Sequence, residues 1–480
     1  MAMNRRNFLG AAGALAAVWR SMPSAATDLD TSALITLAEA AAAMEAGRLT
    51  ARALTLTYLE RIDALDRRGP ELRAVLEVNP HALEIAADLD RERRAHGARG
   101  PLHGMPLLIK DNVETQDHML TTAGSLALEG WYAPAYALDR TPSGSSSGSA
   151  VAVSAGLCVA AVGSETDGSI VSPASINGIV GLKPTVGLVS RRGVVPISHS
   201  QDTAGPLTRS VRDAAILLGA MAGPDAKDPA SAAARGHFES DYVRYLNVDG
   251  LRGTRLGIAR RFFADNAPLN AYFDRCASLL TQAGATLVDP ADFPMHGEWV
   301  APELEVLLYE FKADLNAYLA RIPPALPVHN LSELIRFNSE QSARELALFD
   351  QELLRQADAK GDLNNAEYLN AREICLKATR TNGIDALLAE HRLDAIVTLT
   401  SGPAWLIDPV NGDTDTGGCS SPAAIAGYPH ITVPTGLYRR LPIGLSFFGA
   451  AWSEPTLLRL ASGFEHIAQP RPIPQFVATV

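Results

Sequence analysis

Apolar residues recur at spacings of three and four in several long stretches of the chain, which is the period of an amphipathic helix. The pattern predicts helices over 34–44, 50–66 and 79–97, and helical structure almost throughout 301–390. Thr50 and Asn79 are side chains suited to cap the second and third of these helices, and Gly97 follows the end of the third. The N-terminal third and the region after residue 300 are therefore expected to be rich in helix.

Shorter apolar runs, bounded by turn residues and rich in β-branched side chains, predict buried strands. These runs are LRAVLEV from Leu72, MPLLIK from Met105, GLCVAAVGSE from Gly156, RLGIARR near Leu256, DAIVTL from Asp394 and HITVPTG from His430. Strands that alternate with helices favour an α/β fold whose sheet is covered by helices on both faces. No internal repeat or long linker divides the chain, so we expect one large domain.

Composition agrees with a globular protein that buries a sizeable core, because 47% of the 480 residues are apolar and 20% are charged. The 53 acidic residues outnumber the 42 basic ones and give a net charge of -11, which argues against a nucleic-acid partner. The four cysteines, Cys158, Cys276, Cys375 and Cys419, are too far apart for a CxxC metal or redox motif. We interpret all four as packing residues.

The N-terminus has the pattern of an export signal. Arg5 and Arg6 precede the apolar stretch 8–19, and the small residues PSAA end at Ala26. This stretch is shorter than the about 20 residues that a permanent membrane anchor requires. We therefore predict a twin-arginine signal peptide over 1–26, a mature domain over 27–480, and a periplasmic or secreted protein without a membrane anchor. A disordered or amphipathic tail is the alternative.

Lys110 and two clusters of glycine and serine are the candidate chemical groups. Lys110 ends an apolar run, where it either reaches solvent or is buried with a lowered pKa and acts as a base. The clusters are TPSGSSSGSAVAVSAG over 141–156 and GSETDGSIVSPAS over 163–175. The turn from Thr166 to Ser169 enters a predicted helix, so its N–H groups are suited to bind an oxyanion. Ser169 is equally suited to cap that helix.

These segments taken together, GMPLLIKDN, PSGSSSGSA and GSETDGSI followed by GIVGLKPTVGLVSRRG, resemble the amidase signature family. The resemblance extends from about residue 30 to the last predicted strands. It implies a mixed, twisted sheet and a Ser-Ser-Lys triad. In that triad Ser169 matches the nucleophile, Lys110 matches the base, and Ser145 matches the bridging serine, whose preceding peptide bond is cis in the family.

The resemblance also implies acyl transfer from a carboxamide without a metal or an organic cofactor. The oxyanion is expected on the backbone N–H groups of the turn, from Thr166, Asp167, Gly168 and Ser169. The expected substrate is the C-terminal amide of a peptide, and small aliphatic or aryl amides are the alternative. A transamidation subunit for tRNA shares the motif, but an exported chain is unsuited to that role. A monomer is the default expectation.

The chain departs from the family between Lys110 and Ser145, which lie only 35 positions apart. Around 134–136 it lacks a stretch that the resemblance leads us to expect, comprising a helix, a core strand and a loop beside the active site. Loss of an inner strand is expected to leave backbone groups of its neighbours unpaired, at about 1–3 kcal/mol for each buried group. A catalytically impaired amidase-like protein is therefore an alternative to an active enzyme.

Two further residues have alternative interpretations. GSSSG from Gly144 satisfies the G-x-S-x-G pattern of α/β-hydrolases, with Ser146 as nucleophile. The preceding RTPSG is a poor strand, and no histidine stands out as the partner, so this interpretation is disfavoured. Asp202, within SQDTAGP, is interpreted as a residue that orders a loop.

Overall fold

The computed structural model describes residues 34–115, 117, 119–125, 137–263, 265–322, 326–347, 349–408, 410–468 and 473–480. The described residues belong to one compact unit, Ala33–Val480. The predicted signal peptide and the site of the expected missing stretch, 134–136, lie outside the described residues. No helix in the described ranges is both long enough and apolar enough to cross a membrane.

Nine strands in the described residues form one mixed sheet, in the order β1-β2-β4-β3-β8-β9-β7-β5-β6. Three pairs are parallel, β1 with β2 and β5 with both β6 and β7, and the other neighbours are antiparallel. The fold class is therefore the predicted one. The strands are β1 Leu107–Ile109, β2 Ala160–Glu165, β3 Val180–Lys183, β4 Thr203–Thr208, β5 Arg255–Ile258, β6 Thr286–Val288, β7 Ala395–Leu399, β8 His430–Tyr438 and β9 Leu441–Phe448.

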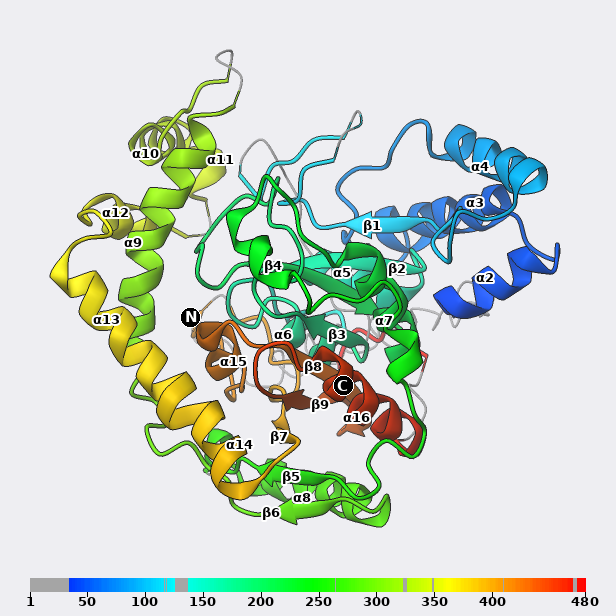
Figure 1. Cartoon of the computed structure of the whole chain (residues 1–480). Coiled ribbons are helices and arrows are strands. Elements are labelled where there is room, and N and C mark those ends of the chain that lie inside the picture. The colour runs from blue at the N-terminus through cyan, green and yellow to red at the C-terminus, as the bar shows by residue number, and fades with distance from the viewer. Residues whose placement is uncertain are drawn as a thin grey trace, which may run out of the picture. The chain divides into compact units, whose positions relative to one another are not determined.

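Helices surround this sheet (Figure 1). Thr50 caps α3 by accepting a hydrogen bond from the Ala53 N–H, and Gly97 ends α4, as the sequence predicted. The α-helices are α2 Leu37–Glu45, α3 Ala51–Arg61, α4 Ala82–His96, α5 Ser147–Ala155, α6 Val171–Ile176, α7 Val211–Met221, α8 Ala267–Gln282, α9 Val300–Leu319, α10 Leu331–Glu340, α11 Ser342–Glu345, α12 Glu352–Asp358, α13 Ala366–Leu376, α14 Asp385–His391, α15 Ser421–Ala426 and α16 Glu454–Ile467. Two π-helical segments, Ile62–Arg67 and Lys377–Ile384, continue α3 and α13.

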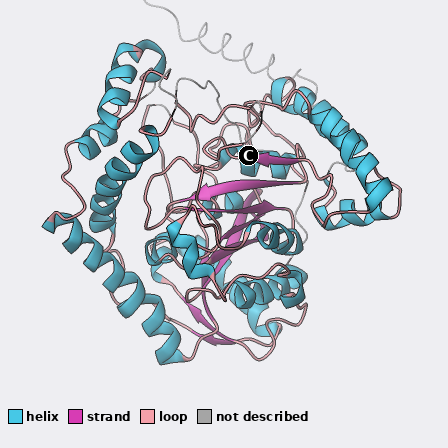
Figure 2. Cartoon of the chain, turned by 45° about the horizontal axis from the view of Figure 1, so that its top comes forward, coloured by secondary structure: helices cyan, strands magenta, loops and turns pink. Residues whose placement is uncertain are grey.

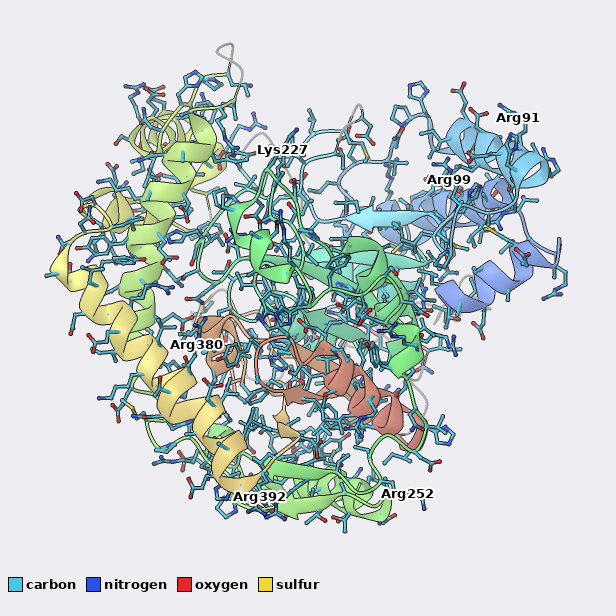
Figure 3. All side chains as sticks on the ribbon, viewed as in Figure 1. Arg91, Arg99, Lys227, Arg252, Arg380 and Arg392 are labelled. Atoms are coloured by element: carbon cyan, nitrogen blue, oxygen red, sulfur yellow. The ribbon has the colours of Figure 1, made fainter. Side chains whose placement is uncertain are left out.

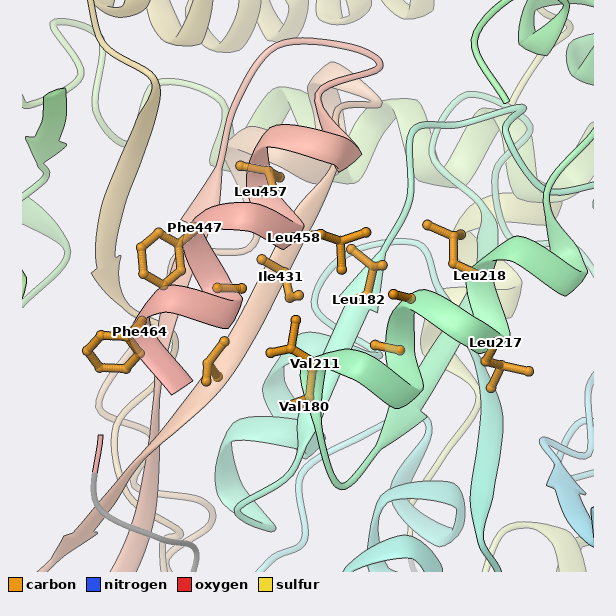
Figure 4. Close-up of a cluster of buried hydrophobic side chains, with 14 of the residues drawn as sticks. Val180, Leu182, Val211, Leu217, Leu218, Ile431, Phe447, Leu457, Leu458 and Phe464 are labelled. Carbon is orange, nitrogen blue, oxygen red and sulfur yellow. The ribbon is translucent and has the colours of Figure 1, made fainter. Parts of the chain in front are cut away.

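The strands run through the middle of this unit with helices on both sides (Figure 2). On one face, α7 and α16 pack over the central strands, where Leu218 and Leu458 meet Leu182 and Ile431 (Figure 4). On the other face, α5 and α6 bury small side chains such as Ala150 and Ala174 against the sheet. Small side chains bring these two helices close to the strands, and both adjoin the glycine and serine clusters. The four cysteines are buried and unpaired in disulfides, in agreement with a packing role.

The predicted strand from Leu72 is wrong, because 71–79 is irregular backbone. The buried carboxylate of Asp66 accepts hydrogen bonds from the backbone N–H groups of Ala74 (2.6 Å) and Val75 (3.2 Å). Arg73 adopts a left-handed conformation, with φ of 54°. A side chain therefore takes the N–H groups that a neighbouring strand would otherwise pair, and the apolar residues are buried without forming a sheet.

The described strands form one continuous sheet, without a gap between neighbouring strands. Strand β1 ends the sheet, and among the described residues its outer side has no partner strand. Ile109 on this strand is 36% exposed. Backbone groups at such an edge are accessible to water, which satisfies them at much lower cost than a buried position allows.

Candidate active site

Lys110 lies at the end of β1, where the strand delivers its side chain to the first glycine and serine cluster. Its Nζ lies 2.7 Å from Ser145 Oγ, 2.9 Å from Ser164 Oγ and 3.2 Å from the Ser164 carbonyl oxygen. Burial lowers the pKa of Lys110 to about 7, although the charges of Glu165 and Asp202 act in the opposite direction. A large fraction of the lysine is therefore neutral near pH 7.

The neighbours of Lys110 fit a neutral amine. Such an amine has two N–H groups and one lone pair, and the carbonyl and hydroxyl oxygens of Ser164 are placed to accept the two N–H groups. The Ser164 hydroxyl in turn lies 3.2 Å from Asn112 Oδ1, to which it donates. The lone pair is then left for Ser145, so the arrangement suits Lys110 as an acceptor of the Ser145 proton.

Ser145 lies at an exposed turn directly before α5. The Gly144–Ser145 peptide bond is cis, as the resemblance implied. The next residue ties this turn to the second cluster, because the Ser146 N–H donates to the Ser169 carbonyl oxygen at 3.1 Å. The backbones that carry Ser145 and Ser169 are therefore side by side.

The turn from Thr166 to Ser169 leads from β2 into α6. Within the described residues, the N–H groups of Asp167, Gly168 and Ser169 donate no hydrogen bond, and neither does the half-buried Ser169 hydroxyl. Gly168 has a φ of 81°, and a Cβ at this position would lie 2.9 Å from Ser420 Oγ. Only glycine fits here without strain. The turn thus presents three unused donors beside an unused hydroxyl, which is the composition of an oxyanion site.

Glu165 fixes the residues that follow this turn. Its buried carboxylate accepts hydrogen bonds from the N–H groups of Ile170 (2.7 Å) and Val171 (3.0 Å). Burial raises the pKa of Glu165, and the charge of Lys183 opposes that effect. Glu165 therefore accepts hydrogen bonds from the N–H groups at the start of α6, and the N–H groups of the preceding turn stay available.

Ser146 has a structural role rather than that of a nucleophile. Its side chain is 1% exposed, and its hydroxyl donates to the Ser164 carbonyl oxygen at 3.0 Å. The Ser164 N–H donates back to Ser146 Oγ at 3.3 Å. Ser146 therefore joins the first cluster to β2, and the α/β-hydrolase interpretation of GSSSG is not supported.

Asp202 orders the loop that covers the turn, as expected. One of its carboxylate oxygens accepts from the N–H groups of Ile197 (2.8 Å) and Ser198 (2.9 Å), and the other accepts from the Thr166 hydroxyl at 2.6 Å. Burial raises the pKa of Asp202 to about 6. Thr166 is thereby held by its side chain, and Gln201 Nε2 donates to its carbonyl oxygen at 3.2 Å.

The sequence interpretation missed the residues that contact Lys110 and the Thr166–Ser169 turn. Ser164 and Asn112 stand inside the motifs, in GSETDGSI and GMPLLIKDN, so their place beside Lys110 was a signal that could have been used. Gln201 and Glu303 are joined by a hydrogen bond of 2.9 Å although 102 positions separate them in the sequence. No local sequence pattern predicts a contact between two residues so far apart in the chain.

One group of potential metal ligands occurs in the described residues, formed by His199, Glu310 and Asp314. Its members already satisfy one another and their neighbours. His199 Nδ1 lies 2.9 Å from Asp314 Oδ2, and Glu310 accepts hydrogen bonds from the hydroxyls of Tyr368 (2.7 Å) and Ser198 (2.5 Å). The arrangement is explained as a hydrogen-bond network and does not call for an ion.

The chain is similar to known amidases over most of its length. The sequence model of the Amidase family matches residues 53–138 and 134–458. A probable amidase of Arabidopsis thaliana is 37% identical over 486 aligned positions, which take in 90% of this chain and 89% of the relative. The aligned region is longer than this whole chain of 480 residues, so the relative has positions without a counterpart here. The two matched segments meet at 134–138, which agrees with a stretch missing near 134–136.

Two solved structures are similar in fold and in sequence. The peptide amidase PAM in complex with the competitive inhibitor chymostatin is 44% identical, with a TM-score of 0.88, over 94% of this chain and 100% of that one. Native peptide amidase from Stenotrophomonas maltophilia is 45% identical, with a TM-score of 0.86, over 94% and 99% of the two chains. The chain is therefore a member of the amidase signature family and an amidase, a hydrolase that acts on the carbon–nitrogen bond of linear amides.

Proposed function

We propose that this amidase removes the C-terminal amide group of peptides through an acyl-enzyme on Ser169, with Ser145 and Lys110 as the proton relay. One observation carries the relay: Lys110, with a pKa lowered to about 7, lies 2.7 Å from Ser145. The free N–H groups of the adjacent turn support the same role for Ser169.

Acylation follows from this geometry. Neutral Lys110 accepts the proton of Ser145 as Ser145 accepts the proton of Ser169, and Ser169 Oγ forms a bond to the carbonyl carbon of the substrate. The oxyanion that develops is held by the N–H groups of Asp167, Gly168 and Ser169, each worth about 3 kcal/mol in the transition state. The relay requires the Ser169 hydroxyl to turn toward Ser145 when substrate binds, since the two hydroxyls form no hydrogen bond in the described residues.

Breakdown of this intermediate returns the proton. The carbon–nitrogen bond breaks, and the departing NH₂ group takes a proton from Ser145, which Lys110 reprotonates, so that ammonia leaves. Water then adds to the ester carbonyl while the same relay accepts its proton. The Ser169–acyl bond breaks, Ser169 regains its proton, and the peptide acid is released. Every atom of the products comes from the amide and one water molecule.

The substrate class rests on similarity. The two peptide amidase structures share 44% and 45% identity with this chain over nearly its whole length, whereas the plant amidase shares 37%. A small aliphatic or aryl amide is the alternative substrate, because loops that select a substrate vary within one fold.

The test is ammonia release from an N-acetylated dipeptide amide, compared with acetamide and benzamide. The variants are Ser169→Ala and Lys110→Ala, and Lys227→Ala, which replaces a surface lysine outside the site (Figure 3), is the matched control. We expect the dipeptide amide to have the highest kcat/KM and each site variant to lose at least about 1,000-fold. Preference for acetamide or benzamide would overturn the peptide assignment, and retained activity in Ser169→Ala would overturn the nucleophile.

A further inference from the structure

A pair of carboxyl groups lies behind the turn that carries the unused N–H groups. The Asp167 side chain extends into the protein, where its Oδ2 accepts from the Ser421 hydroxyl at 2.7 Å. Its Oδ1 is buried and accepts no hydrogen bond from any N–H or hydroxyl of the described residues. The neighbour of Asp167 is the carboxyl group of Glu303, in the first turn of α9, which is 7% exposed.

Glu303 is also linked to the turn by a second route. Gln201 Nε2 donates to Glu303 Oε1 at 2.9 Å and to the Thr166 carbonyl oxygen at 3.2 Å. Glu303 therefore interacts with the Asp167 side chain directly and with the Thr166 carbonyl oxygen through Gln201. The first turn of α9 is thus connected to both Thr166 and Asp167.

Two ionised carboxylates in contact at a buried site repel each other, so one of them keeps a proton. The buried Lys183 interacts electrostatically with Asp167. Burial, and then the charge of Asp167, raise the pKa of Glu303 to about 9. A protonated Glu303 has an O–H donor, and Asp167 Oδ1 is a buried acceptor that lacks one.

We propose that Glu303 is a positioning residue, which in its protonated form donates to Asp167 and so holds the Asp167–Ser169 turn with its N–H groups directed at the oxyanion. This proposal rests on the proposed function of that turn. Loss of the proton places a second negative charge against Asp167, and the repulsion moves the turn. Activity is therefore expected to fall at alkaline pH, in addition to the acidic limb that Lys110 produces.

Two other ionisable groups interact with the pair, Lys183 with Asp167 and Cys375 with Glu303. Lys183 has its pKa lowered to about 8 by burial, and Cys375 from α13 has its pKa raised to about 12. Lys183 also interacts electrostatically with the buried Glu165, and Cys375 interacts electrostatically with Arg372 and Glu310. Replacement of Glu303 removes its own titration and leaves the titration of Lys183 in place, so a comparison of variants separates the two.

The test compares kcat and KM between pH 6 and pH 11 for the wild type, Glu303→Gln and Glu303→Ala, with an uncharged N-acetylated dipeptide amide. The side-chain amide that Glu303→Gln introduces supplies an N–H donor for Asp167 and an oxygen for Gln201. We therefore expect E303Q to keep near wild-type kcat at pH 7.5 and to lose the fall near pH 9. We expect E303A to lose about tenfold or more in kcat with little change in KM. Glu305→Gln, two positions along α9 and paired with Lys360, is the matched control and should keep the wild-type profile.

A second readout does not depend on catalysis. The folded-state pKa of Glu303 is raised from 4.5 to about 9, so the unfolded chain releases this proton first as the pH rises. Wild-type stability to urea should therefore fall from pH 6 to pH 9 relative to that of E303Q. If the wild type hydrolyses no peptide amide but shows this difference in stability, the substrate assignment fails, and the assignment of a protonated Glu303 that donates to Asp167 is retained. Any of three results would overturn the proposal. They are an alkaline fall in activity that is unchanged in E303Q, a kcat of E303A equal to that of the wild type, and the same pH dependence of stability in the wild type and E303Q.

Discussion

The pH dependence of amide hydrolysis tests the proposed role of Lys110 directly, because the proposed relay requires this lysine to be neutral. Burial lowers the pKa of Lys110 from 10.5 to about 7. With that value, about one molecule in ten has a neutral Lys110 at pH 6, and about nine in ten have it at pH 8. A lysine with the ordinary value is neutral in only about three molecules in 1,000 at pH 8. Burial therefore accounts for about 300-fold in active enzyme at pH 8.

The expected profile of kcat/KM follows from the sign of this shift. Activity rises about tenfold from pH 6 to pH 8 and is level just above pH 8, since further loss of the lysine proton adds little. Below pH 6 the fall is steeper, because Asp202, with a pKa of about 6, also becomes protonated and weakens the loop that holds Thr166.

The assay is ammonia release from an N-acetylated dipeptide amide without ionisable side chains, at substrate concentrations well below KM. Under these conditions the profile reports the ionisation of the free enzyme. Circular dichroism at each pH confirms that the protein stays folded. A rate that still rises tenfold for each pH unit between 8 and 9.5 would refute the reasoning, because Lys110 would then have an ordinary pKa.

Three further predictions concern other parts of the chain. Gly168→Ala forces a side chain into a left-handed conformation at about 1–2 kcal/mol and displaces the N–H donors, so kcat/KM should fall about 100-fold; wild-type kcat/KM would contradict the oxyanion role. Asp66→Ala leaves the N–H groups of Ala74 and Val75 unpaired and should lower the free energy of unfolding in urea by about 3 kcal/mol. The control Asp63→Ala replaces an exposed carboxylate and should change this free energy by less than about 0.5 kcal/mol. Equal effects of the two substitutions would contradict the structural role of Asp66. The double variant Arg5→Lys and Arg6→Lys should keep the chain in the bacterial cytoplasm on fractionation, and normal export would disprove the predicted twin-arginine signal.

The elements that local pattern predicted well are those in which the period of the sequence decides the structure. The apolar run before Lys110 forms β1, and Thr50 caps α3, because each depends on neighbours in the sequence. The run from Leu72 has the composition of a strand, yet Asp66 takes two of its N–H groups. Tertiary hydrogen bonds override local preference there, and such contacts are not encoded within a short window.

The candidate site divides in the same way. Lys110, Ser145 and Ser169 stand in recognisable motifs, and the structure brings Lys110 to Ser145 and places the backbones of the two serine clusters side by side. Ser164 and Asn112, which hold Lys110, stand in the same motifs, whereas other residues that hold the Thr166–Ser169 turn come from distant segments. Glu303 reaches the Thr166–Ser169 turn from α9, where its only sequence signal is an acidic residue near the start of a helix, a common and solvated position.

The central claim is that Ser169 is the nucleophile of a working triad in this chain. The most direct measurement is tryptic peptide mapping by mass spectrometry after reaction with a fluorophosphonate, a reagent that phosphonylates activated serines. We predict one adduct per chain, located on Ser169, with labelling abolished in Lys110→Ala and unchanged in Lys227→Ala. An adduct on Ser145 or Ser146, or a folded wild-type protein that does not react, would contradict the account.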